Sequence, residues 1–164
     1  MIVLSLLIAS ALASPSPTTG TFRPTVSVSD ALSGLEMCRA VITPSGVDET
    51  PFKKAHWPKL KLTASSDEDP GQVKALKAWS PPNSFMMVLV SQKDGKSRCN
   101  VAAPVGNRQT ADELIAKLPV RLTPGDKRGQ FDGEDNGQQI HVSMGDNLDL
   151  PMINITVTRP TEPK

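Results

Sequence analysis

The residues of this chain with the most versatile chemistry are its two histidines, His56 and His141. Imidazole titrates near neutral pH, so either side chain is a candidate general base or metal ligand. A general base needs a positioned partner, however, and neither histidine has one near it in the sequence. No G-x-S-x-G, S-x-x-K, H-E-x-x-H or phosphate-binding-loop pattern occurs. We therefore predict no catalytic residue, no cofactor and no metal site.

One acidic segment invites a calcium-binding interpretation. Residues Asp132 to Gly137 place oxygen ligands at alternate positions before a glycine, as the opening of an EF-hand loop does. The twelfth position is Ser143 rather than a bidentate glutamate, and the flanking residues alternate as strands do instead of entering helices. Turn chemistry alone accounts for each residue, so we favour an acidic hairpin loop closed by Asn136-Gly137 and leave Ca²⁺ binding open.

The only cysteines are Cys38 and Cys99, and we predict that they form a disulfide. They are too far apart for a redox C-x-x-C motif, and oxidising compartments form and keep such pairs. Closing this loop removes chain entropy equivalent to roughly 4 kcal/mol. Cys38 falls on the apolar stripe of a predicted helix and Cys99 on a predicted strand, so the bridge should join the two elements as scaffold rather than as a site.

The two tryptophans, Trp57 and Trp79, each lie next to a proline-containing loop. Amphipathic rings suit interfaces, so these indoles are candidates for a binding surface. Large aromatic rings are also commonly core residues at corners of a fold. The sequence leaves both interpretations open.

The first 13 residues have the character of a cleaved signal peptide. They carry no charged side chain and end in Ala-Leu-Ala, the pattern that signal peptidase reads, and the apolar run is too short and interrupted to span a bilayer. Residues 14–28 form a Pro-, Ser- and Thr-rich lead, followed by one domain over residues 29–160. We therefore expect a periplasmic or secreted protein with no stable membrane span after cleavage.

The chain carries 18 basic and 17 acidic residues, a net charge of +1, so no global field attracts nucleic acid or anionic lipid. Periodicity predicts an α+β fold with two short helices packed on an antiparallel sheet of about five to six strands. The elements are a helix over residues 29–42 capped by Ser29 or Asp30, a strand over 59–64, a strand or helix over 72–79, a hairpin over 85–103 and a helix over 110–118 begun by a capping box at Thr110. A C-terminal meander over 128–158 follows, and His141 lies on its strand over 138–144.

The helix with one cysteine, a tryptophan near 57, Trp79 with Pro82-Asn83, and the hairpin VLVSQKDGKSRCNV together resemble small uncharacterised exported proteins of proteobacteria. The resemblance covers residues 30–103. It implies export and a paired cysteine, and it implies no known site.

Three hypotheses about function follow from these features. The first is a non-catalytic binding or inhibitor-like domain that recognises a protein or envelope component through its sheet face or loops. The second is a periplasmic hydrolase with dispersed Asp, Glu and His residues, and the third is a structural envelope protein. A histidine hydrogen-bonded to a carboxylate at a pocket would favour the enzyme.

Overall fold

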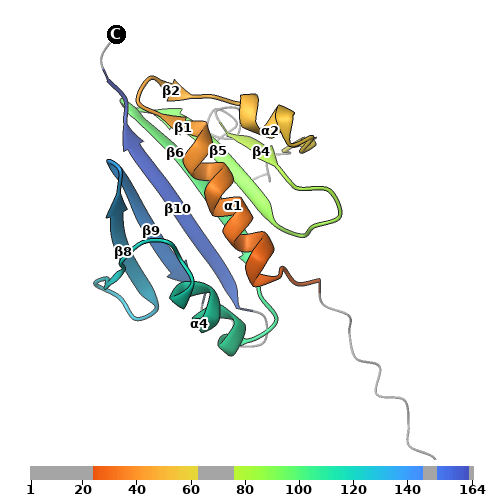
Figure 1. Ribbon diagram of the computed structural model, residues 1–164, viewed down its shortest axis with the longest axis vertical. Coiled ribbons are helices and arrows are strands. Elements are labelled where there is room, and N and C mark those ends of the chain that lie inside the picture. The colour runs from red at the N-terminus through yellow and green to blue at the C-terminus, as the bar shows by residue number, and fades with distance from the viewer. Residues whose placement is uncertain (1–23, 63–75, 146–150, 163–164) are drawn as a thin grey trace, which may run out of the picture.

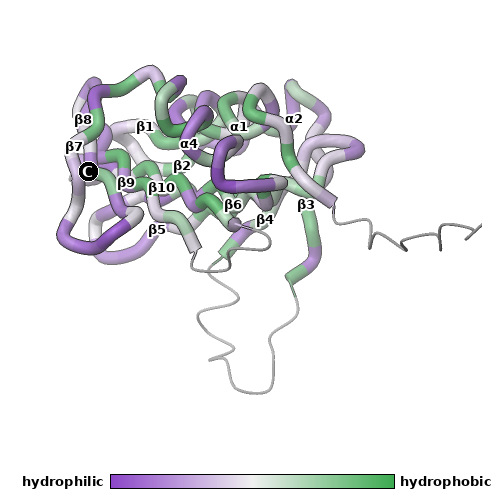
Figure 2. Tube along the Cα trace, turned by 90° about the horizontal axis from the view of Figure 1, so that it is seen from below, coloured by the Kyte–Doolittle hydropathy of each residue, from purple (hydrophilic) through white to green (hydrophobic). Residues whose placement is uncertain are grey.

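A layer of helices lies on one face of a large antiparallel sheet in the computed structural model, which describes residues 24–62, 76–145 and 151–162 (Figures 1 and 2). The eight strands of this sheet follow the order β3-β4-β5-β6-β10-β9-β8-β7, and β1 and β2 form a separate pair. The helices are α1 Val28–Val41, α2 Thr50–Lys54 and α4 Arg108–Ala116. The strands are β1 Ile42–Thr43, β2 Gly46–Val47, β3 Lys59–Leu60, β4 Lys77–Trp79, β5 Met87–Lys93, β6 Lys96–Pro104, β7 Thr123–Pro124, β8 Gln130–Asp135, β9 Gln138–Met144 and β10 Met152–Pro160.

The α+β class is confirmed, but the sheet has more strands than the predicted five to six. The two strands beyond that number are short: β7, at one edge of the sheet, has two residues, and β4, between the other edge strand β3 and β5, has three. A strand of two or three residues is too short for an alternation of apolar and polar residues to be recognised in the sequence. The predicted strand over 59–64 shrinks to β3, and the undecided segment before Trp79 ends in the strand β4, with residues 63–75 outside the described part.

Two tight turns confirm the predicted hairpins. Asp94 and Gly95, which join β5 to β6, have φ values of 53° and 68°, and Asn136 and Gly137, which join β8 to β9, have 53° and 71°. Positive φ at both central positions is the type I′ geometry that suits the twist of paired strands. The C-terminal meander is also confirmed, because β8, β9 and β10 are consecutive neighbours.

Both long helices begin earlier than their sequence patterns indicate. Ser27 caps α1 by accepting a hydrogen bond from the Asp30 amide, where Ser29 or Asp30 was expected to cap. Asn107 caps α4 through the Thr110 amide, so the predicted capping box at Thr110 is wrong. At each helix start several adjacent residues have side chains that can cap. The residue that does so is the one whose backbone is extended.

The helix α1 packs against the two central strands, β6 and β10 (Figure 1). Its buried stripe includes Ala31, Leu35 and Cys38, none of which is accessible to solvent. At Gly34 the helix approaches the sheet so closely that a Cβ would lie 2.6 Å from the Met86 sulfur. The core therefore sits between α1 and one face of the sheet.

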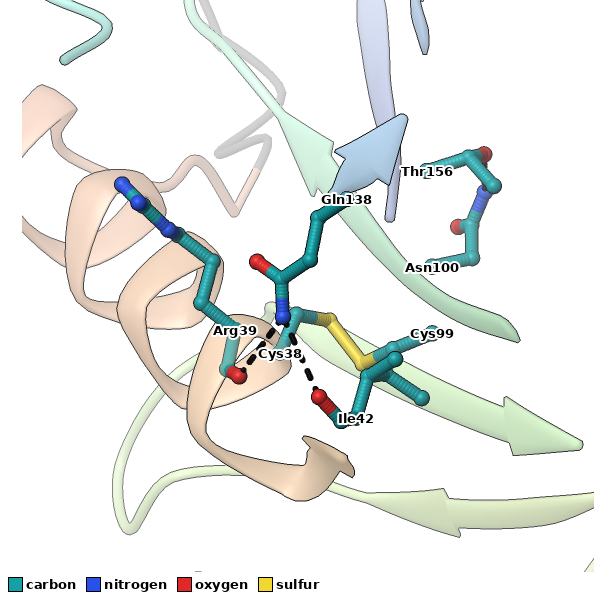
Figure 3. Close-up of a disulfide and its surroundings, with 7 residues drawn as sticks. All are labelled: Cys38, Arg39, Ile42, Cys99, Asn100, Gln138 and Thr156. Carbon is teal, nitrogen blue, oxygen red and sulfur yellow. Dashed lines mark hydrogen bonds between the residues drawn. A yellow bond between two sulfur atoms is a disulfide. The ribbon is translucent and has the colours of Figure 1, made fainter. Parts of the chain in front are cut away.

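The predicted disulfide is present and joins the predicted elements. Cys38 of α1 is bonded to Cys99 of β6 with a Cα–Cα distance of 5.4 Å, and both residues are completely buried (Figure 3). The bridge spans 61 residues of sequence and holds the helix on the centre of the sheet. Its burial leaves the sulfurs inaccessible, which supports the scaffold interpretation.

A second tie holds the end of α1. The Gln138 side chain of β9 donates from Nε2 to the carbonyls of Arg39 and Ile42, at 3.0 and 3.1 Å (Figure 3). The last carbonyls of a helix have no hydrogen-bond partner within the helix. Because these carbonyls are packed away from water, the Gln138 amide supplies the hydrogen bonds that water would otherwise make. Gln138 is 5% exposed.

The predicted signal peptide and most of the predicted lead lie outside the described residues. Among the helices that the structure does describe, none is long and apolar enough to cross a membrane.

Candidate functional site

The face of the sheet opposite the helices has no helix of the described chain on it (Figure 2). We call it the open face. Because side chains alternate between the two faces of a strand, the register of the central strands defines its members. They are Met87, Leu89, Ser91, Lys93, Lys96, Arg98, Asn100, Ala102, Met152, Asn154, Thr156, Thr158, Gln139, His141, Ser143, Gln130, Asp132 and Glu134.

A row of polar side chains crosses the middle of the open face. Cross-strand register places Asn100, Thr156, His141 and Asp132 side by side on β6, β10, β9 and β8. The Asn100 amide donates to the Thr156 hydroxyl at 2.9 Å, and these two side chains point away from α1 (Figure 3). The row is half-buried or exposed throughout, so its hydrogen-bonding groups are accessible to a ligand.

The row ends at a hydrogen-bonded pair in a shallow hollow. His141 Nδ1 lies 2.7 Å from Asp132 Oδ1, and both residues line a hollow of about 580 Å³ with Arg121, Glu134 and Thr158. With Nδ1 donating to the carboxylate, Nε2 is left as an acceptor, the arrangement of a general base with its orienting acid. The pair is exposed, with side-chain accessibilities of 41% for His141 and 56% for Asp132.

Several features of a hydrolytic centre are absent from the described residues. No hydrogen bond there joins Nε2 of His141 to a hydroxyl, and no group of three or more His, Cys, Asp or Glu side chains gathers to hold a metal ion. His56 is exposed at the corner after α2, apart from any described carboxylate partner. The exposure of both side chains leaves the pair at His141 open to water, where electrostatic interactions are weaker than in a water-excluded site.

The carboxylates of the acidic segment, residues 132–137, do not all point to one common position. Asp132 and Glu134 lie on the open face, whereas Asp135 lies on the other face and forms an ion pair with Arg39 of α1. Residues 132–135 belong to the strand β8, and the loop itself is the two-residue turn Asn136-Gly137. Alternation along the strand thus directs neighbouring carboxylates apart, which supports the hairpin interpretation over an EF-hand loop.

A second hollow, of about 470 Å³, lies at the hairpin end of the same face. It is lined by Ser91, Lys93, Asp94, Lys96 and Arg98. The register sets Lys93 directly opposite Lys96. None of the three cations forms an ion pair within the described part of the chain.

The two tryptophans lie on the helix side of the sheet. Trp79 is 5% exposed and stacks on Phe52 with ring centroids 4.8 Å apart, while Trp57 is 9% exposed and tilts against the same ring at 5.7 Å. Phe52 belongs to α2, which is tied to β4 by an ion pair between Glu49 and Lys77. The Lys77 hydrogen bond holds the pKa of Glu49 below its ordinary value. Burial of the indoles thus favours the core interpretation over a binding surface.

The sequence patterns indicated an isolated His141 and did not indicate the second hollow, which we call the basic hollow because Lys93, Lys96 and Arg98 line it. A signal for both was present in the turns. A two-residue turn at Asn136-Gly137 pairs residues 135 and 138, and counting outward along the strands pairs Asp132 with His141. The same count from Asp94-Gly95 pairs Lys93 with Lys96.

No protein-family model, curated protein or solved structure matches this chain.

Proposed function

We propose that this protein is exported and acts outside the cytoplasm as a binding or inhibitor-like domain, which recognises a protein or an envelope component through its open face. The observation that carries the proposal is an eight-stranded sheet covered by helices on one face and lined on the other with accessible polar and charged side chains. Export is supported by the buried disulfide, because such bridges persist in oxidising compartments.

The composition of the open face suits recognition. Its hydrogen-bonding groups lie beside half-buried or exposed apolar side chains, among them Met87, Leu89 and Met152. A mixture of apolar contact and polar groups is typical of non-obligate interfaces. The edge strands are short, which limits the alternative of pairing through a sheet edge.

Photo-crosslinking in the native host tests this proposal. A photoreactive residue in place of Asn154, in the centre of the open face, is expected to give a discrete covalent adduct. The same residue in place of Ser33, which is exposed on α1, is the matched control and is expected to give none. Equal adducts from both positions, or no adduct from Asn154, would count against recognition by the open face.

The hydrogen bond between Asp132 and His141 supports a second candidate, a hydrolase of small esters or of cell-wall substrates. If the pair is a general base, His141→Gln abolishes hydrolysis of p-nitrophenyl acetate, since the remaining amide cannot accept the proton at neutral pH. Asp132→Asn lowers the rate by disturbing the tautomer. A wild-type protein that releases nitrophenol no faster than buffer excludes this activity for that ester class.

A further inference from the structure

Three cationic side chains of the open face, Lys93, Lys96 and Arg98, line the basic hollow. Like charges directly opposite one another on adjacent strands destabilise the pairing, and Lys93 faces Lys96 in this way. Arg98 adds a third positive charge on the same face, and among the described residues that line the hollow only Asp94 carries a carboxylate. The arrangement therefore has an excess of positive charge that a bound anion would relieve.

The hollow also offers the donors that an oxyanion needs. A guanidinium and two ammonium groups provide charged N–H donors. Hydrogen bonds from charged donors to phosphate are stronger than hydrogen bonds between neutral groups. The Ser91 hydroxyl lies opposite Arg98 in the register and adds a neutral donor. These groups come from both strands of one tight hairpin, so their backbone positions are set relative to each other.

The hollow adjoins the rest of the open face. Arg98 pairs with Thr158 of β10, and Thr158 also lines the neighbouring hollow that contains His141. An anionic group held at Arg98 would leave the remainder of its ligand lying across polar side chains at the centre of the sheet.

We infer that the hollow formed by Ser91, Lys93, Lys96 and Arg98 binds a phosphate group of the partner that the open face recognises. The inference deepens the proposed function and rests on it. It assigns a chemical class to the partner: a molecule or surface that presents multiply charged phosphate.

The test is a titration of the purified protein with inorganic tripolyphosphate, monitored by calorimetry and by backbone amide shifts. We expect shifts centred on residues 91–98, and affinity that falls as salt rises because exposed charges are screened. Lys96→Gln with Arg98→Gln should weaken binding at least tenfold, since two charged contacts are lost. The matched control, Lys53→Gln with Lys54→Gln, removes the same charge from α2 and should change affinity less than twofold.

A parallel arm uses vesicles with and without phosphatidylglycerol. Binding of tripolyphosphate alone identifies a soluble phosphate ligand, and additional binding to the anionic vesicles that the Lys96 and Arg98 variant loses identifies a lipid headgroup. Equal weakening by both double variants, or no binding of either probe, overturns the inference. If crosslinking from Asn154 persists while both probes fail, the phosphate site is wrong and the binding function stands.

Discussion

A double variant, Cys38→Ala with Cys99→Ala, is expected to lower the free energy of unfolding by about 2 to 5 kcal/mol, the usual loss for a native disulfide in a small domain. The two cysteines are 61 positions apart in the sequence, so removal of the bridge frees many conformations of the unfolded chain. Both sulfurs also fill space in the core. Urea denaturation monitored by tryptophan fluorescence measures the change.

Reduction provides the control for this experiment. The wild-type protein should lose similar stability when reductant is present, whereas the double variant should be insensitive to it. Alkylation of the untreated wild-type protein followed by intact-mass analysis should find no free thiol. An unchanged unfolding midpoint in the double variant, or two alkylated cysteines in the wild type, would show that the bridge does not support the fold.

Replacing Gln138 by leucine is expected to destabilise the protein by about 1 to 3 kcal/mol for each carbonyl left without a donor. The side chain has a similar size, but it removes both hydrogen bonds to the end of α1, at Arg39 and Ile42. The site is buried, so water does not readily replace the lost donor. Hydrogen exchange should show the largest loss of protection in the last turn of α1.

The neighbouring residue supplies the matched control. Gln139 is exposed on the open face, and Gln139→Leu should change the free energy of unfolding by no more than about 0.5 kcal/mol. Equal effects of the two substitutions would mean that the hydrogen bonds of Gln138 contribute nothing beyond those of a surface residue.

The central hairpins were predictable because their information is local. Alternation over residues 138–144 matches β9 residue for residue, and the turns at Asp94-Gly95 and Asn136-Gly137 demand a backbone geometry that few other dipeptides adopt. The helix starts were misplaced because Ser27, Ser29 and Asp30 are all acceptable caps, and only backbone geometry distinguishes them.

The candidate site was less predictable than the fold. His141 was assigned correctly to a strand, yet its partner Asp132 was treated only as part of an acidic loop. Trp57 and Trp79 had two interpretations in the sequence, and their burial follows from Phe52, a residue of a five-residue helix with no strong pattern. Contacts between elements depend on tertiary packing, and the periodicity within one segment carries no information about that packing.

The sequence by itself determined the α+β class, the two tight hairpins and, through each turn, the register that pairs Asp132 with His141 and Lys93 with Lys96. These features depend on neighbours along the chain. Only the tertiary structure decided that the last strand, β10, lies between β6 and β9 and joins the two hairpins into one sheet. Strands this far apart in the sequence pair because the pairing buries a common core. The helix α1 covers that core over β6 and β10, and the disulfide holds it there. That choice brings the histidine pair and the basic hollow onto one continuous open face.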